Sequence, residues 1–416
     1  MNDMRLKDYI ISANTGLDAI KRAPIIEENT GLKCIRIQDI SQKKKYLDWG
    51  NTRTTKKDYQ KFKLRKNDLL IARTGATVGV SYLVKEECES VFNNGTIRLR
   101  FNREIDTNFV YQIFQTKSFK KYVDNISCVS TQPNLKVENL LRFTIPDINL
   151  KKQKRIAMIL SKYDDLIENN NRCIELLEQI IEKIYIEWFV KFKFPENENY
   201  EFVECKPLGW IYGNDNQSNI PKKWHYGPLS EIGQFERGKN ITSEKMIEGN
   251  IPVISAGLQP SGYHNEANVF GKSLTMSASG GNADTNYYPS DTIEVKKDGT
   301  GYYREGYLKY NLKDIWAADC SYYQNDSNIW FVYSSLKFIK LAIKNLQVGA
   351  AQPHVYPKNI NNLNIIIPEE KYIKMYQDKV SVMFEEIKIL NEENTNLIQQ
   401  RDLLLHRLMS GKLEIK

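Results

Sequence analysis

The sequence predicts an α+β protein with two similar globular domains, separated by two long helices that form an antiparallel coiled coil. Three observations predict this fold class. A motif occurs twice about half a chain apart, apolar runs of strand length precede each copy, and a segment without Gly or Pro follows each copy. The repeat has to be explained first, because it sets how many times one folding unit is used.

The repeated motif places a Gln-Pro pair shortly before an Ile-Pro pair. The first copy contains Gln132-Pro133-Asn134-Leu135 and ends at Ile145-Pro146. The second copy contains Gln352-Pro353-His354-Val355 and ends at Ile367-Pro368. We therefore expect each copy to close a globular domain of the same architecture.

The first globular domain covers residues 1–146. Apolar runs at residues 34–37, 69–72 and 96–99 are bounded by Gly, Asn and Thr, which is typical of strands joined by turns. One amphipathic helix is expected near residues 108–122.

Residues 147–194 are predicted to form the first long helix. Their apolar residues alternate steps of four and three, which is the heptad seam of a coiled coil. The seam consists of Ile156, Leu160, Tyr163, Ile167, Asn170, Ile174, Leu177, Ile181, Ile184 and Trp188.

A linker at residues 195–221 leads to the second globular domain, residues 222–368, with expected strands at 252–254, 273–276 and 329–332. The second long helix is expected within residues 369–416. Its seam is Ile373, Tyr376, Val380, Met383, Ile387, Leu390, Asn394, Leu397, Arg401, Leu404 and Leu408.

The two seams match each other when the helices run antiparallel. With Asn170 opposite Asn394, each residue of the first seam faces a residue of the second, so that Ile156 meets Leu408 and Trp188 meets Tyr376. Two facing asparagines can hydrogen-bond and fix the register of a coiled coil. The alternative is two separate helices, each packed on its own domain, with both asparagines in water.

Composition limits the classes of function. The chain has 416 residues, 41% hydrophobic and 26% charged, and a net charge of +8. It has no apolar run long enough to span a membrane and no secretion signal, so we expect a cytoplasmic protein. Six scattered cysteines without a CxxC pair argue against a disulfide framework or a zinc site. Two similar recognition units with a mild basic excess suit a target with two parts, and DNA is the obvious candidate.

Several motifs together resemble the specificity subunit of type I restriction–modification systems over essentially the whole chain. They are Gln132-Pro133, Ile145-Pro146 with the following residues 151–157, the second-half opening Ile220-Pro221-Lys222-Lys223-Trp224 with residues 229–232, residues 67–79, and the tail at 400–413. The first half departs from the pattern because it lacks the Pro-x-x-Trp opening. Residues 278–281 also differ from the matching residues 73–76, so the two domains should read different bases.

This resemblance implies a function for each part. Each globular domain would be a target recognition domain that reads one half of a split double-stranded DNA site. The long helices would set the spacing and dock two modification subunits, which use S-adenosylmethionine to methylate adenine. Restriction subunits are expected to join this core. The chain itself would be non-catalytic, with no cofactor or metal.

The sequence contains no recognisable motif of the main classes of catalytic site that we considered. It contains no P-loop, no HExxH, and no Asn-Pro-Pro-Tyr run of the kind that methylates a flipped base. Two alternatives remain open: a fused methyltransferase or nuclease with unrecognised motifs, and a coiled-coil adaptor without a DNA role.

Base reading needs directional donors and acceptors, such as Arg for guanine and Asn or Gln for adenine. The candidates lie in turns at the ends of predicted strands, where solvated loops are the alternative interpretation. They are Arg36, Gln38, Arg73, Thr74, Asn93, Asn94 and Thr131 in the first domain, and Gln259, Tyr263, Ser279, Asn282, Tyr302 and Arg304 in the second.

Two further surfaces are expected. Basic residues at 43–45 and 61–66 could neutralise phosphates or simply face solvent. Apolar residues outside the seams suggest that partners pack on the helices. They are Ile159, Leu176, Ile180, Phe189, Phe384, Leu403 and Leu405. For Arg401, within the seam, we expect a side chain that reaches out to solvent.

Overall fold

We describe a computed structural model of the chain, which covers residues 3–42, 44–75, 77–127, 134–205, 219–255, 260–277, 308–339 and 356–409. The chain divides into two compact units. Unit 1 contains Met1–Asn169 and Glu393–Lys416, and unit 2 contains Asn170–Ala283 and Pro289–Glu392. Each unit therefore combines one globular region, which we call its head, with one part of each long helix.

Head 1 is built on two four-stranded sheets. The first has the order β2-β9-β6-β7, and the second the order β3-β5-β4-β8, with β4 and β8 parallel. Their bounds are β2 Ile10–Thr15, β9 Thr96–Phe101, β6 Leu69–Ala72, β7 Ser81–Leu83, β3 Ile25–Ile26, β5 Gly50–Thr52, β4 Lys33–Ile35 and β8 Ser90–Phe92. The strands expected near residues 34, 69 and 96 are thus confirmed.

Five short α-helices and a two-stranded pairing belong to the described part of head 1 as well. The helices are α1 Ile37–Ser41, α2 Lys56–Phe62, α3 Thr107–Phe114, α4 Lys117–Ser127 and α5 Val137–Leu140. β1 (Asp3–Arg5) pairs antiparallel with β10 (Thr144–Pro146), where the first motif copy ends. The prediction of one helix near residues 108–122 was wrong, because the hydroxyl of Thr116 accepts a hydrogen bond from the Phe119 N–H and starts α4 as a separate helix.

Head 2 repeats this topology. Its sheet β14-β20-β17-β18 has the same connections as β2-β9-β6-β7, and in its second sheet β15 pairs parallel with β19 as β4 does with β8. The bounds are β14 Glu236–Arg237, β20 Cys320–Tyr323, β17 Ser273–Ser277, β18 Leu308–Asn311, β16 Gly262–His264, β15 Ile251–Ile254 and β19 Trp316–Ala317. The duplication predicted from the sequence is therefore a duplication of the fold.

The closing pair of strands is repeated as well. β13 (His225–Pro228) pairs antiparallel with β21 (Asn364–Ile367), where the second motif copy ends. After each opening strand, a buried leucine donates its backbone N–H to the residue before the closing strand. Leu6 bonds Phe143 and Leu229 bonds Leu363, each at 2.9 Å. Further strands and α-helices among the described residues are β11 Phe202–Glu204, β12 Asn219–Pro221, α8 Ile329–Phe338 and α10 Pro357–Asn361.

Residues 329–332, predicted as a strand, form the start of α8. A short run of Ile, Trp, Phe and Val cannot be distinguished from a buried helix by periodicity. Here Trp330 stacks on Phe384 of the second long helix, with ring centroids 3.6 Å apart. α8 is buried on most of its surface, which explains its lack of polar positions.

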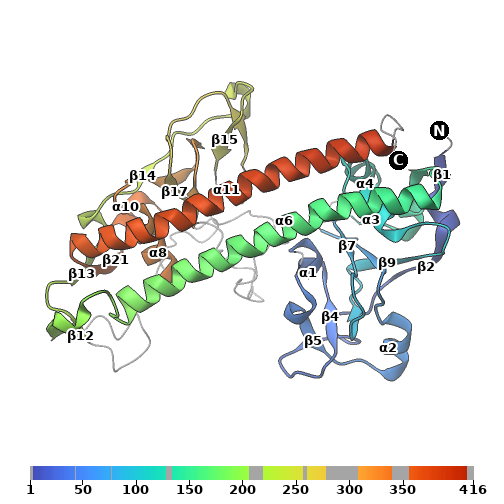
Figure 1. The fold of residues 1–416 in the computed structure, drawn as a ribbon, viewed down its shortest axis with the longest axis horizontal. Coiled ribbons are helices and arrows are strands. Elements are labelled where there is room, and N and C mark those ends of the chain that lie inside the picture. Colours follow the sequence, from blue (N-terminus) through green and yellow to red (C-terminus); the bar gives the residue numbers. More distant parts are fainter. Residues whose placement is uncertain are drawn as a thin grey trace. The chain divides into compact units, whose positions relative to one another are not determined.

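The two long helices are α6 (Leu150–Tyr185), which ends in a π-helical turn at Ile186–Val190, and α11 (Glu370–Met409). Figure 1 shows them in green and red. In unit 1 the start of α6 packs against the end of α11, where Ile156, Leu160, Leu405 and Leu408 share one core. In unit 2 the end of α6 packs against the start of α11, where Trp188 contacts Tyr376. In both units the helices are therefore antiparallel, as predicted.

Every predicted seam position is buried or half-buried. Asn170 and Asn394 are both buried. Because they belong to different units, their pairing stays a prediction. Arg401 does not reach out to solvent as expected, since its guanidinium donates to Asp164 at 2.7 Å and it is 9% exposed.

A buried glutamine attaches each head to its long helix. The side-chain oxygen of Gln153 in α6 accepts the Asp106 N–H at 2.9 Å, just before α3. The side-chain oxygen of Gln377 in α11 accepts the Trp330 N–H at 3.0 Å, in the first turn of α8. Both amide nitrogens also donate to backbone carbonyls, those of Ile148 and Asp326. We call these two contacts the glutamine joints.

Candidate nucleic-acid interface

Five of the predicted residues of head 1 meet at one end of its sheets. β4 and β8 are parallel, so their ends bring Arg36 and Asn93 together, and the Asn93 N–H donates to Ile35 at 3.2 Å. β6 ends at the same place, where the Arg73 N–H donates to the carbonyl of Gly95 at 2.9 Å. We call this group the strand-end cluster; it consists of Arg36, Arg73, Thr74, Asn93 and Asn94.

Arg73 is held in place by two acceptors. Its Nε donates to Oδ1 of Asn134 at 3.2 Å, and its Nη1 donates to the carbonyl of Asn94 at 3.5 Å. Thr74 forms a bridge with Asn134, and the Leu135 N–H bonds the Arg73 carbonyl at 2.7 Å. The described part of the first motif copy therefore supports Arg73, and a fixed guanidinium is well suited to bidentate contact with guanine.

Arg36 precedes α1 and lies beside a buried carboxylate. Asp39 accepts the Arg36 backbone N–H at 2.8 Å, and its carboxylate lies 3.7 Å from Arg36 Nε and 3.6 Å from Lys44 Nζ. Burial raises the pKa of Asp39, while the Arg36 backbone bond and the two cations oppose that rise. Asp39 thus holds two basic side chains near the cluster. Gln38 lies one residue into α1 and is half-buried.

The corresponding end of head 2 has different chemistry. Ser255 follows β15, and Ala318-Asp319 connects β19 to β20 where head 1 has Asn93-Asn94-Gly95. Arg237 approaches Asp319 at 3.4 Å, and its guanidinium lies 5.9 Å from the ring of Tyr356. Heads with one topology and different side chains at this end would read different bases.

The structure brings together some of the residues predicted from the sequence to read bases, but not all of them. Arg36, Arg73, Thr74, Asn93 and Asn94 lie together, with Gln38 nearby. Tyr263 is exposed but lies within β16, paired with Pro252, and not in a turn as predicted. Thr131, Gln259, Ser279, Asn282, Tyr302 and Arg304 lie outside the described residues, as do Gln132-Pro133 and Gln352-Pro353.

The sequence did not point to Asn134, Arg237 and Tyr356 as candidates, although they contact the candidate residues or lie at the corresponding place in head 2. Asn134 was visible in the motif, but its contact with Arg73 spans 61 positions of the chain. Arg237 becomes a candidate only through the strand pairing, which puts it in the place of Thr15 of head 1.

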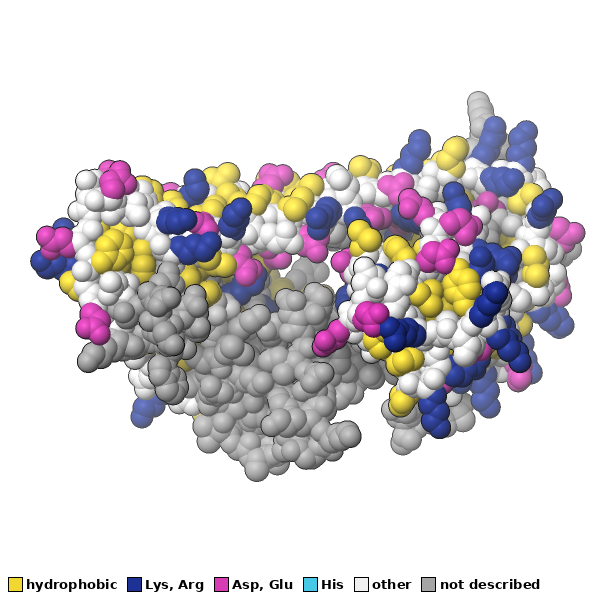
Figure 2. All heavy atoms as spheres, turned by 90° about the horizontal axis from the view of Figure 1, so that it is seen from below, with side chains coloured by type: hydrophobic (Ala, Val, Ile, Leu, Met, Phe, Trp, Pro, Cys, Tyr) yellow, Lys and Arg dark blue, Asp and Glu magenta, His cyan; other side chains and the backbone are white. Residues whose placement is uncertain are grey.

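Basic side chains are numerous on the described surface of head 1. Figure 2 shows Lys and Arg side chains gathered over this region. In head 1 the buried Arg98 donates to the carbonyls of Lys61 and Lys63 at 3.3 and 3.0 Å, and burial lowers its pKa to about 10. Such a surface favours contact with polyanions.

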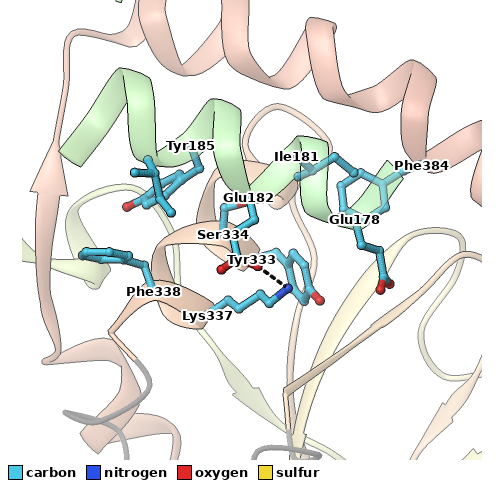
Figure 3. Close-up of a pocket in the computed structure, with 10 residues that line it drawn as sticks. Glu178, Ile181, Glu182, Tyr185, Tyr333, Ser334, Lys337, Phe338 and Phe384 are labelled. Carbon is cyan, nitrogen blue, oxygen red and sulfur yellow. Dashed lines mark ion pairs between the residues drawn. The ribbon is translucent and has the colours of Figure 1, made fainter. Parts of the chain in front are cut away.

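Other kinds of site receive no support from the described part of the chain. Among those residues, no three His, Cys, Asp or Glu side chains are arranged to hold a metal ion. A search of the same residues found no helix long and apolar enough to cross a membrane. A hollow in unit 2 between α6 and α8 (Figure 3), where Lys337 pairs with Glu182, has a volume of about 20 Å³, which holds little more than one water.

Of the apolar residues outside the seams, some are exposed and others are buried. Leu176, Ile180 and Leu403 are exposed on the helices, as predicted. The prediction was wrong for Phe189, Phe384 and Leu405, which are buried in the cores of their own units. They are covered because each helix packs against a head as well as against the other helix.

Comparison with known proteins agrees with this geometry. The model of the "Type I restriction modification DNA specificity domain" family matches twice, at residues 2–179 and 221–400. The chain belongs to the type I restriction–modification DNA specificity family. Each match to this family covers one head and most of the long helix that follows it, so the family's unit corresponds to the repeat that the fold contains.

Individual family members are similar over most of the chain. The type I restriction enzyme MjaIX specificity subunit of Methanocaldococcus jannaschii is 26% identical over 383 residues, 89% of this chain and 84% of that protein. The HindI specificity subunit of Haemophilus influenzae is 24% identical over 72% of this chain and 74% of its own length. The crystal structure of the S subunit of a type I restriction–modification system from M. genitalium has the same fold, with a TM-score of 0.52 and 18% identity over 100% of this chain and 96% of that one.

Proposed function

We propose that this chain is the specificity subunit of a type I restriction–modification complex, in which head 1 reads one part of a DNA site and head 2 reads the other. The observation that carries the proposal is the double match to a DNA specificity family, one match for each head, and the two heads share the topology of their four-stranded sheet β2-β9-β6-β7 or β14-β20-β17-β18. In this role the chain recognises DNA and leaves methyl transfer and cleavage to other subunits.

Within head 1 we propose the strand-end cluster as the base-reading surface. Arg73 and Arg36 are suited to guanine, and Asn93 and Asn94 to adenine. Asn134 positions Arg73. In head 2 we propose Tyr263, Arg237 and the corresponding turns, together with Gln259, Ser279, Asn282, Tyr302 and Arg304. Phosphates would bind the surrounding Lys and Arg side chains.

We further propose the domain boundaries of the chain and the subunits with which it assembles. Heads at residues 1–146 and 222–368 are linked through helices at 147–194 and 369–416 and the linker at 195–221. Two modification subunits, which use S-adenosylmethionine, dock on the helices, and restriction subunits join them. The complex works in the cytoplasm, because its DNA target lies there.

Genome-wide methylation mapping tests this function. Cells that express the chain with its modification subunit should carry methylated adenines in a two-part sequence with a gap of undefined bases. The variant Arg73→Ala should relax or lose one part of that sequence and leave the other part unchanged. Methyl transfer by the purified chain alone, with labelled S-adenosylmethionine and DNA, would instead favour an enzyme.

A further inference from the structure

Unit 1 contains a second basic site, away from the strand-end cluster. It is a hollow of about 430 Å³ between the turn before β6, the turn after β9, and the starts of α3 and α6. The charged residues that line it are Arg65, Lys66, Asp68, Arg100, Arg103, Asp106 and Lys154. Because this turn precedes β6 and Arg73 follows it, the hollow and the cluster lie at opposite ends of the strand.

The carboxylates around the hollow are already used within unit 1. Asp68, which is 2% exposed, accepts two hydrogen bonds from Arg100 at 2.6 and 2.8 Å. Asp106 caps α3 by accepting the Phe109 N–H at 2.9 Å. At the rim, Glu87 accepts the Lys66 N–H and Glu104 accepts from Asn102.

Four cations that line the hollow have no carboxylate partner among the residues that the structure describes. Arg65, Lys66, Arg103 and Lys154 are exposed, and within the described parts of the chain none of their side chains forms an ion pair. The hollow thus presents an excess of positive charge, and the site is complementary to several negative groups at once.

The rim of the hollow is fixed by the guanidinium groups of the buried Arg98 and the half-buried Arg100. Arg98 and Arg100 both donate to the carbonyl of Lys63, at 3.0 and 2.9 Å, just before Arg65 and Lys66. Asp68 also accepts the Arg65 N–H at 3.0 Å. A rim held in this way loses little conformational entropy when it binds a ligand.

Apolar surface adjoins the charge. Ile11 lines the hollow and is 68% exposed. On α6, Leu150, Lys154 and Met158 follow at intervals of four, so they lie on one stripe, and Met158 is 57% exposed. Exposed Ile and Met beside the cations suit a protein segment better than a sugar–phosphate chain.

We propose that this hollow docks an acidic segment of the modification subunit, whose Asp or Glu side chains pair with Arg65, Lys66, Arg103 and Lys154 while its apolar residues cover Ile11 and Met158. This inference rests on the proposed function, since it names the chemistry of the partner that binds α6. The contact anchors the partner to head 1 as well as to the helix.

The test compares two charge-matched variants of the full-length chain with its cognate modification subunit as the probe. Arg103→Glu/Lys154→Glu should weaken association at least tenfold and flatten its dependence on salt. The control Lys56→Glu/Lys57→Glu reverses two charges in α2, outside the hollow, and should bind as the wild type does. Circular dichroism melting checks that both variants are folded.

Carbodiimide cross-linking gives an independent readout. The reagent condenses a lysine amine with a nearby carboxylate, with loss of water, and should join Lys66 or Lys154 to an Asp or Glu of the modification subunit. Equal weakening by both variants would overturn the proposal, because it would reflect net charge alone. Unchanged association with weaker DNA binding would also overturn it and assign the hollow to phosphate. The proposed function is tested independently of this docking contact. It fails if the wild-type complex methylates no two-part site.

Discussion

Gly16 and Gly238 occupy the same place in the two heads, directly after β2 and β14. A Cβ on Gly16 would lie 2.2 Å from the carbonyl oxygen of Phe92, and one on Gly238 would lie 2.5 Å from that of Ala318. Backbone atoms cannot move aside as the end of a side chain can. Each glycine therefore allows a strand to pass close to the turn that carries the candidate base-reading residues.

We expect Gly16→Ala and Gly238→Ala each to lower the free energy of unfolding by about 1–3 kcal/mol, the usual cost of added volume in a packed site. Guanidinium unfolding of each variant measures the change. The exposed Lys57→Ala should stay within about 0.5 kcal/mol of the wild type. If both glycine variants were as stable as the wild type, each strand could move away from the neighbouring turn without loss of stability, which would contradict this prediction.

At the same scale, the candidate site was predictable in part. Polar residues at the ends of the predicted strands included Arg36, Arg73, Asn93 and Asn94, because strand ends carry a head's turns. These side chains lie together because β4 and β8 pair in parallel. The sequence of neither strand predicts that the two will pair. For Asn134 and Arg237 no local pattern exists, since only tertiary contacts define their surroundings.

Among the elements, the long helices were the most predictable. Their seams repeat over many heptads, and such long periods outweigh local exceptions. Short elements were less certain: the apolar start of α8 was predicted as a strand, and Thr116 divided one expected helix into α3 and α4. The ion pair between Arg401 and Asp164 was not predicted, because the sequence around a charged seam residue does not indicate which residue of the other helix it will contact.

The glutamine joints lead to a prediction about how the heads are attached. We expect Gln153→Met and Gln377→Met each to cost about 1–3 kcal/mol, because each leaves a backbone N–H without its acceptor, that of Asp106 part-buried and that of Trp330 buried. The free energy of chemical unfolding measures this. Lys374→Met, on an exposed position of α11, is the matched control. A loss below about 0.5 kcal/mol in both joint variants would mean that water or a neighbour replaces the amide.

For the whole molecule, the sequence predicted the duplication and the antiparallel helices but not the division into units. The boundary falls within both long helices, at Asn169 and Glu392, because each half of a helix packs against a head. Heptad periodicity is uniform across that boundary and therefore contains no signal of it. The packing that creates it comes from Phe189, Phe384 and Leu405, which lie outside the seams.

The lengths of the helices give a test of the proposed reading of two-part sites. α6 and α11 contain 36 and 40 residues, about 54 and 60 Å at about 1.5 Å per residue. Deleting residues 170–176 together with 388–394 removes one matched heptad from each helix, about 10 Å. We expect the gap in the methylated sequence to shorten by about three base pairs, since a DNA turn of about 34–36 Å holds about 10.

Methylation mapping of cells that carry the shortened chain gives the gap directly. Deleting 170–176 alone is the control, because it leaves the seams out of register and should abolish methylation. A shortened chain that still methylates DNA with the original gap would contradict the role of the helices as a spacer.

The core of unit 1 has a consequence for synthesis. It contains Leu6, from the start of the chain, and Leu405 and Leu408, from its end. On the ribosome, the first head emerges long before these last leucines are made. Its packing can be completed only after α11 has been synthesised, so the head that is made first matures late, and the nascent chain must keep that apolar surface from aggregating in the meantime.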